Sequence, residues 1–172
     1  FLQGEFENSL KIAGIGVQTF PKSPALNRIS SFDLTNLKRY DEALSYADKL
    51  FNQSENAKIT ESDYLYYGYA YLGKNDYDNA IAMFNKSIEL NNDNEQDKSD
   101  ALKNIASAYE SKGDMVNATA AYDKYLKSLK QLTAYDLGNL AGMYQKHAET
   151  LTGTEKEEAL KKADSIWGEI AE

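Results

Sequence analysis

The chain has 172 residues, with 27 acidic and 19 basic side chains, and its formal net charge is -8 at pH 7. Nucleic acids and anionic membrane surfaces need a basic face to neutralise their phosphates, so this charge disfavours both as partners. No segment approaches the roughly 18 to 20 consecutive apolar residues of a transmembrane helix. The absence of cysteine removes disulfides and thiolate metal sites, and it is compatible with the cytoplasm as well as with the periplasm or secretion.

Three helices are predicted in the N-terminal third of the chain. The first lies within residues 1–23. The second covers residues 24–37, because Pro24 suits a first helical turn, where its missing N–H has no partner to lose. The third runs from Tyr40 to about Phe51. The turn before it, Leu37-Lys38-Arg39, contains no glycine, so a positive backbone angle there would be strained by roughly 1 kcal/mol.

A tyrosine-rich stretch follows, and it has the clearest pattern in the chain. Residues 64–71 read Tyr-Leu-Tyr-Tyr-Gly-Tyr-Ala-Tyr, and a second apolar run begins at Tyr77. Asn75-Asp76 interrupts the periodicity between the two runs. The small residues Gly68 and Ala80 are flanked by large ones at helical spacing. The pattern therefore predicts two helices that meet at a close contact.

The C-terminal half continues as helices separated by short polar breaks. After the polar residues 91–97, Asp97 or Ser99 is expected to cap the next helix. Gly113 and Asp114 are expected to end one helix and begin another. A helix starting near residue 134 is predicted to reach about residue 151. Thr154 then begins a Thr-x-x-Glu capping box that precedes the last helix.

The tyrosine-rich segment resembles the tetratricopeptide-repeat family, whose 34-residue unit places aromatic, Leu-Gly, Tyr and Ala residues at set positions. Those positions hold Tyr64, Tyr67-Gly68, Tyr71, Ala80, Phe84 and Ser87. The resemblance implies an all-α helix-turn-helix solenoid of about nine helices, wound as a right-handed superhelix. It implies one array over residues 1–172, in which residues 1–23 are the second helix of a truncated repeat and the complete repeats are 24–57, 61–94, 99–132 and 134–172.

The truncated first repeat suggests that the chain is a fragment of a longer repeat protein. Each repeat buries its apolar face on its neighbours, so a helix without its partner should expose such a face. We expect that face to run through Leu10, Ala13 and Val17. The alternative is a degenerate but complete first helix.

The family's geometry also implies an interaction surface, because the first helix of each repeat lines the concave side of the superhelix. The lining positions selected as partner contacts are Arg28, Phe32, Leu65, Tyr66, Tyr69, Lys103, Asn104, Ser107, Asn139 and Lys146. This groove has an aromatic end and a polar end, which suits an extended peptide held by aromatic packing and by amide hydrogen bonds. In the alternative, these are ordinary surface residues and Tyr66 and Tyr69 pack on each other.

The predicted function is a non-catalytic scaffold that binds a protein or peptide segment in this groove. The alternative is a structural spacer or a self-assembly region of a larger protein, acting through its terminal helices. The single histidine, His147, has no cysteine to join it in a metal or nucleophile site, and no glycine-rich phosphate loop occurs. We therefore expect no enzyme activity, catalytic residue, metal site or cofactor.

Overall fold

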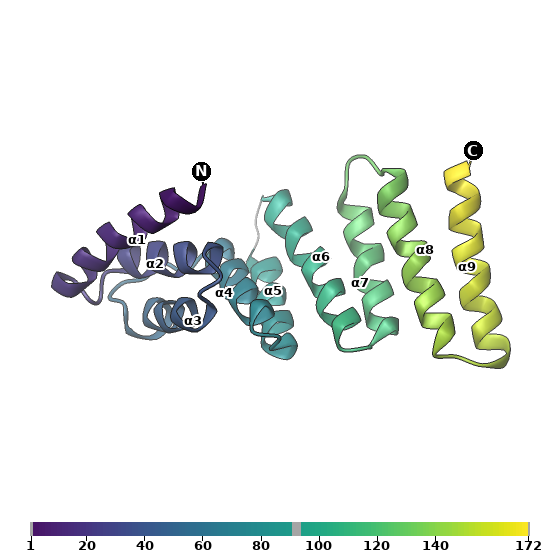
Figure 1. Cartoon of the computed structure of the whole chain (residues 1–172), viewed down its shortest axis with the longest axis horizontal. Coiled ribbons are helices and arrows are strands. Elements are labelled where there is room, and N and C mark those ends of the chain that lie inside the picture. The colour runs from purple at the N-terminus through teal and green to yellow at the C-terminus, as the bar shows by residue number, and fades with distance from the viewer. Residues whose placement is uncertain (1, 91–93, 172) are drawn as a thin grey trace. The chain divides into compact units, whose positions relative to one another are not determined.

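The computed structural model describes residues 2–90 and 94–171, and within these residues the chain is built only from helices and their connections. Nine α-helices are present in the described part (Figure 1): α1 (Leu2–Thr19), α2 (Pro24–Asn36), α3 (Tyr40–Asp48), α4 (Glu61–Gly73), α5 (Tyr77–Leu90), α6 (Glu95–Ser111), α7 (Met115–Ser128), α8 (Ala134–Glu149) and α9 (Gly153–Ala171). A π-helical segment, η1 (Lys49–Gln53), extends α3. The predicted all-α class and number of helices are confirmed.

The chain divides into two compact units. Unit 1 is Phe1–Asp97 and unit 2 is Lys98–Glu172, so α6 begins in unit 1 and continues in unit 2. Unit 1 contains the tyrosine-rich stretch on α4, and unit 2 contains α7, α8 and α9.

The start of each helix depends on a polar side chain that accepts a backbone N–H. Thr60 and Asp63 form a reciprocal capping box at α4, and Thr133 and Asp136 form the same box at α8. The cap of α6 is Asn94, whose side chain accepts from the N–H of Asp97 at 3.1 Å, so the predicted caps Asp97 and Ser99 are wrong. The capping box predicted from Thr154 is also wrong, because α9 begins at Gly153 and Thr154 lies inside its first turn.

Three turns between consecutive helices contain a residue in the left-handed backbone conformation, with a positive φ angle. Lys38 has φ 60° between α2 and α3, Asn75 has φ 60° between α4 and α5, and Gly113 has φ 77° between α6 and α7. The positive backbone angle considered for the turn at Leu37-Lys38-Arg39 is therefore present at Lys38. A Cβ atom crowds the backbone in this conformation, so of these three turns the one at Gly113 forms without that strain.

The apolar face expected on the first helix lies elsewhere. Leu10 packs against the core cluster of Leu34, Ala43 and Ala70, and Ala13 is only 3% exposed. The exposed apolar side chains of this region are Leu2, Ile12, Ile15 and Phe20. The prediction was wrong because it assigned the missing neighbour to the side of α1 that already packs on α2.

The predicted close contact between the two helices of the tyrosine-rich stretch is present. A Cβ atom added at Gly68 of α4 would lie 2.5 Å from the ring of Phe84 in α5. Phe84 and Ala80 are fully buried. Because no side chain separates the two helices at Gly68, the Phe84 ring occupies the space directly against the α4 backbone.

Candidate interaction surface

Residues one repeat apart meet on successive first helices. In unit 1, Arg28 contacts Asp63 and Ser62 contacts Asp97, and both pairs are separated by 35 positions. The ring of Phe32 packs against the ring of Tyr66, with the two ring centroids 4.3 Å apart. In unit 2, Lys146 contacts Glu110, 36 positions away. Within each unit, corresponding side chains of neighbouring repeats therefore form a continuous surface.

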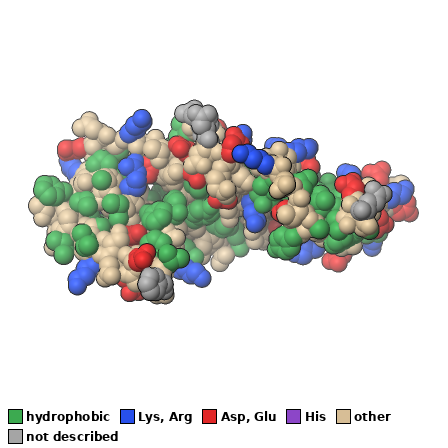
Figure 2. Space-filling model, turned by 90° about the horizontal axis from the view of Figure 1, so that it is seen from above, with side chains coloured by type: hydrophobic (Ala, Val, Ile, Leu, Met, Phe, Trp, Pro, Cys, Tyr) green, Lys and Arg blue, Asp and Glu red, His purple; other side chains and the backbone are tan. Residues whose placement is uncertain are grey.

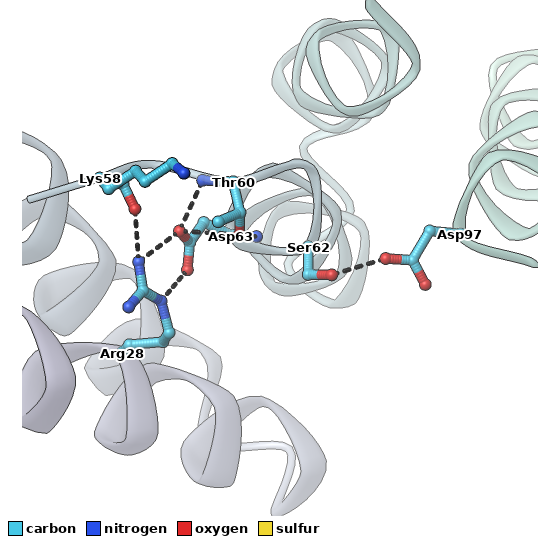
Figure 3. A network of polar contacts seen from close by, with 6 residues as sticks. All are labelled: Arg28, Lys58, Thr60, Ser62, Asp63 and Asp97. Atoms are coloured by element: carbon cyan, nitrogen blue, oxygen red, sulfur yellow. Dashed lines mark hydrogen bonds and ion pairs between the residues drawn. The ribbon is translucent and has the colours of Figure 1, made fainter. Parts of the chain in front are cut away.

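Arg28 and Asp63 are the centre of a polar network on this surface in unit 1 (Figure 3). The guanidinium donates from Nε to Asp63 Oδ1 at 2.6 Å and from one Nη atom to Asp63 Oδ2 at 2.8 Å. The same Nη atom donates to the carbonyl of Lys58 at 2.8 Å. Asp63 also accepts from the N–H and hydroxyl of Thr60, which caps α4.

The network neutralises Arg28 within the chain. The side chain of Asp63 is 3% exposed and that of Arg28 is 38% exposed, so the ion pair is shielded on one side. Hydrogen bonding to Asp63 raises the pKa of the Arg28 guanidinium above its usual range, and burial opposes this effect. Arg28 therefore orients α2 against α4, and its positive charge is already balanced by a carboxylate.

A row of aromatic rings lies beside this network. Phe32 of α2 contacts Phe6 of α1 at 5.9 Å and Tyr66 of α4 at 4.3 Å between ring centroids. Tyr66 contacts Tyr69 at 5.5 Å, and Tyr69 reaches the buried Phe84 at 5.6 Å. Tyr66 and Tyr69 thus do pack on each other, and both stay partly exposed. Leu65 does not share this surface, because it is buried in the core with 3% exposure.

Two hollows flank Tyr66 in unit 1. The first hollow, of about 210 Å³, is lined by Arg28, Ser31, Phe32, Ala47, Leu50, Phe51, Thr60, Ser62, Asp63 and Tyr66. The second hollow, of about 430 Å³, is lined by Thr35, Asn36, Lys38, Tyr40, Tyr66, Tyr69, Leu72 and Gly73. Tyr66 is the wall between them. Hydrophobic side chains also gather over unit 1 on the face shown in Figure 2.

The π-helical segment η1 shapes the first hollow. Its residues Leu50 and Phe51 line the hollow, and the Phe51 ring packs at 4.8 Å from Tyr64 and 5.1 Å from Tyr67. Ser54 donates to the carbonyl of Lys49 at 3.0 Å and so closes the wide turn. A π-helical turn changes the direction of the following side chains. Phe51 is therefore placed both beside α4 and at the hollow.

The predicted contact residues of unit 2 lie on α6 and α8, and most of their polar groups bind this chain itself. Asn104 donates to the carbonyl of Asp100 at 2.7 Å, and Asn139 donates to the hydroxyl of Tyr122 at 3.2 Å. Lys146 pairs with Glu110 at 2.5 Å. The ammonium of Lys103 lies 5.7 Å from the centre of the Tyr125 ring, and Ser107 is exposed.

Sequence reasoning missed several residues that shape the surface of unit 1. Thr60 and Asp63 carry a recognisable signal, since Thr-x-x-Asp before an apolar run has the spacing of a capping box. Ser31 and Phe51 carry no such signal. Their position at the hollow depends on the contact between α2 and the turn that ends α3.

The described residues offer little support for other kinds of site. Among them, no group of three or more His, Cys, Asp or Glu side chains is arranged to hold a metal ion. None of the helices in the described ranges is long and apolar enough to cross a membrane. His147 lines a separate hollow of unit 2, between α7, α8 and α9, together with Tyr144 and Lys162.

Known proteins with similar sequences include members of a helical repeat family. Residues 64–94 match the family described as tetratricopeptide repeat. The photosystem I assembly protein Ycf3 of Prochlorococcus marinus is 30% identical over 110 residues, which is 60% of this chain and 62% of that protein. The match therefore spans less than two thirds of the length of this relative.

Solved structures with the same fold cover nearly the whole chain. A crystal structure of MamA has 18% identity and a TM-score of 0.71, and the match covers 99% of this chain and 93% of that one. The crystal structure of PilW, a type IV pilus biogenesis factor, has 18% identity and a TM-score of 0.66, and the match covers 87% of this chain and 63% of that one. Identities this low establish the fold alone. The predicted resemblance to the tetratricopeptide-repeat family is confirmed by the match at residues 64–94, and the solved structures share the fold of the chain.

Proposed function

We propose that this protein is a non-catalytic interaction scaffold that binds a peptide or protein segment across the first helices of its repeats. The observation that carries the proposal is the pair of hollows on either side of Tyr66, between α2 and α4. Ligand sites are typically concave and lined mainly by apolar and aromatic side chains with a few placed polar groups. Phe32, Tyr66 and Tyr69 supply the rings, and Asn36 and Lys38 supply polar groups at the rim of the second hollow.

The proposal gives the ten predicted contact residues different roles. Phe32, Tyr66 and Tyr69 are proposed to contact the partner directly, and Arg28 is proposed to hold α2 and α4 in position. Leu65 is left out because it is buried. The five positions on α6 and α8 of unit 2 stay predicted contacts: Lys103, Asn104, Ser107, Asn139 and Lys146.

Site-specific crosslinking tests this proposal in the full chain. A photoreactive amino acid replaces Asn36, which is exposed at the second hollow, and in a matched control it replaces Asn85, which is exposed on α5. Crosslinked partners from a lysate of the source cell are identified by mass spectrometry. We expect a partner that crosslinks at position 36, is absent at position 85 and is lost when Tyr66→Ala is added. A partner that crosslinks equally at both positions would contradict the proposal.

A second candidate function is self-association through the first helix. Ile12 and Ile15 are 71% and 64% exposed and lie one turn apart on α1, so together they form an exposed apolar surface on this helix. Light scattering of the full chain tests it. Self-association requires a measured mass above that of one chain. This mass should fall to that of the monomer in the double variant Ile12→Glu, Ile15→Glu, and it should not fall in the control variant Val116→Glu on α7. A monomer at all concentrations rules out this candidate.

A further inference from the structure

We infer that the two hollows of unit 1 accept a proline-rich segment in the polyproline II conformation, with prolines three residues apart seated on either side of Tyr66. This inference rests on the proposed function and specifies the partner of the same surface. It is carried by the spacing of the hollows and by the chemistry of their walls.

The spacing follows from the positions that line each hollow on the two helices. The first hollow uses Arg28, Ser31 and Phe32 of α2, and the second uses Thr35, Asn36 and, in the turn after α2, Lys38. On α4 and its capping residue the lining residues move from Thr60, Ser62, Asp63 and Tyr66 to Tyr66, Tyr69, Leu72 and Gly73. The shift is about six positions on α2 and about seven on α4, which at 1.5 Å per helical residue is about 9 to 11 Å.

The similar shift on both helices fixes the direction of the pair. The first hollow lies toward the N-terminal ends of α2 and α4, and the second lies toward their C-terminal ends. A bound segment that reaches both hollows therefore runs along the two helices rather than across them.

Two regular peptide conformations place two side chains on the same face at about this spacing, and the polyproline II helix is the narrower of the two. A polyproline II helix has three residues per turn and rises about 3.1 Å per residue, so positions i and i+3 lie on one face about 9.3 Å apart. A strand repeats its faces every second residue, which gives about 6.6 or 13 Å. An α-helix gives about 10.5 Å between i and i+7, and its width of about 10 Å exceeds that of an extended chain.

The walls of the first hollow favour an uncharged side chain. Arg28 and Asp63 neutralise each other, and Ser31 donates to the carbonyl of Ala43 at 3.2 Å. Ser62 donates to Asp97 at 2.6 Å. These groups are engaged with the chain, so a charged ligand group placed here would lose its hydration without a matching partner.

Proline fits these walls for a second reason. Aromatic rings line both hollows, with Phe32, Phe51 and Tyr66 around the first and Tyr40, Tyr66 and Tyr69 around the second. The second hollow also has the polar side chains of Thr35, Asn36 and Lys38. Aromatic-lined grooves recognise proline-rich segments because the ring stacks on aromatic faces and the chain is already ordered before binding. Proline also has no N–H that burial would leave without an acceptor.

Fluorescence anisotropy with labelled synthetic peptides tests the inference on the full chain. The probe is a neutral decapeptide with a central Pro-x-x-Pro in which x is alanine or glycine. A peptide of identical composition with the prolines two residues apart is the spacing control, and a helical peptide with leucines at i and i+7 represents the helical mode. We expect the Pro-x-x-Pro peptide to bind at least about tenfold more tightly than either control, since each well-seated ring contributes about 1 kcal/mol or more.

Variants of Tyr66 test whether the peptide binds at the two hollows. Tyr66→Ala should weaken the Pro-x-x-Pro peptide at least about tenfold, whereas Tyr66→Phe, which keeps the ring, should bind like the wild type. Tyr135→Ala is the matched control, because Tyr135 is a 73% exposed tyrosine of unit 2. Circular dichroism confirms that each variant is folded.

Several results would overturn the inference. These are equal binding of the two proline spacings, tighter binding of the helical peptide, or no binding of the Pro-x-x-Pro peptide to the wild type. If a partner still crosslinks at Asn36 in a Tyr66-dependent way while the proline peptide fails to compete with it, the inference is wrong and the proposed function stands. If neither the crosslink nor the peptide binding is seen, both are wrong.

Discussion

Units 1 and 2 use the same helical pairing but present different chemistry on their first helices. In unit 1, aromatic rings separate two hollows, and the cation at the first hollow, Arg28, is bound to a buried carboxylate. In unit 2, the amides of Asn104 and Asn139 and the ammonium of Lys146 bind acceptors of the chain itself. The repeat pattern therefore sets the arrangement of the helices, while the side chains between the pattern positions decide the chemistry of each surface.

The largest difference between the units should appear when a methyl group is added to a helical glycine. At Gly68 the new Cβ would lie 2.5 Å from the buried Phe84 ring, whereas at Gly142 of α8 it would meet no atom within 4 Å. We expect Gly68→Ala to lower the free energy of unfolding by about 3 kcal/mol through overpacking. Gly142→Ala should raise it by about 0.5 to 1 kcal/mol by restricting the unfolded chain.

Urea unfolding followed by circular dichroism measures both values, and hydrogen exchange of α4 and α5 locates the effect of Gly68→Ala. If Gly68→Ala were as stable as the wild type or more stable, the close contact between Gly68 and Phe84 would be contradicted.

The second comparison concerns the two ion pairs between first helices. Arg28→Met leaves the carboxylate of Asp63, which is 3% exposed, without its guanidinium, and we expect a loss of about 2 kcal/mol. Lys146→Met removes a pair whose side chains are 62% and 34% exposed, so we expect a change below about 0.5 kcal/mol. Chemical denaturation compares the two variants with the wild type.

Asp63→Asn added to Arg28→Met separates the two contributions of this pair. The amide oxygen still caps α4 but carries no charge, so the double variant should recover part of the lost stability. A double variant as unstable as Arg28→Met alone would show that the buried charge is not the cause.

The buried side chains of α2 are mostly polar, whereas α6 buries Ala101, Ile105, Ala106 and Ala108. Asp33 is 3% exposed, and its Oδ2 has no hydrogen-bond partner among the described residues. Burial raises the pKa of Asp33 above its usual value, and a hydrogen bond from Ser9 partly offsets this rise. The folded state therefore holds the Asp33 proton more tightly than the unfolded state.

The contribution of Asp33 to folding stability is therefore favourable at a pH below its pKa in the unfolded chain. It is lost as the pH rises through the pKa of Asp33 in the folded chain. We expect Asp33→Asn to be about 1 kcal/mol more stable than the wild type at pH 7, with the difference shrinking as the pH falls toward 4. Thermal unfolding at several pH values measures this. A difference independent of pH would show that the charge of Asp33 is not responsible.

The smallest change in stability is expected at the turns after α2 and α6. Lys38 holds φ 60° with a side chain, and Gly113 holds φ 77° without one. Lys38→Gly should stabilise the chain by about 0.5 to 1 kcal/mol, and Gly113→Ala should destabilise it by about 1 kcal/mol. Thermal unfolding of both variants measures whether the two substitutions change stability in opposite directions. If Lys38→Gly lowered the stability, the lysine side chain would contribute more to stability than the backbone strain removes.

The regular part of this fold was predictable because its signals are local. Pro24, the Asn75-Asp76 break and the Gly113-Asp114 pair mark helix ends within a few residues of where the structure has them. Errors arose where several nearby polar residues competed for one cap, as with Asn94 against Asp97 and Ser99. The exposed face of α1 was misplaced because it depends on which side of the helix meets α2.

The sequence alone determined the all-α class, the number of helices and the contact of Gly68 with the next helix, because helical periodicity and small residues act over one or two turns. It also selected Phe32, Tyr66 and Tyr69 as surface candidates. Only the tertiary structure decided that Leu65 is buried, that Arg28 is paired with Asp63, and that two hollows flank Tyr66. Those features depend on contacts between residues about 35 positions apart, and which faces meet there is set by how the helices of neighbouring repeats pack.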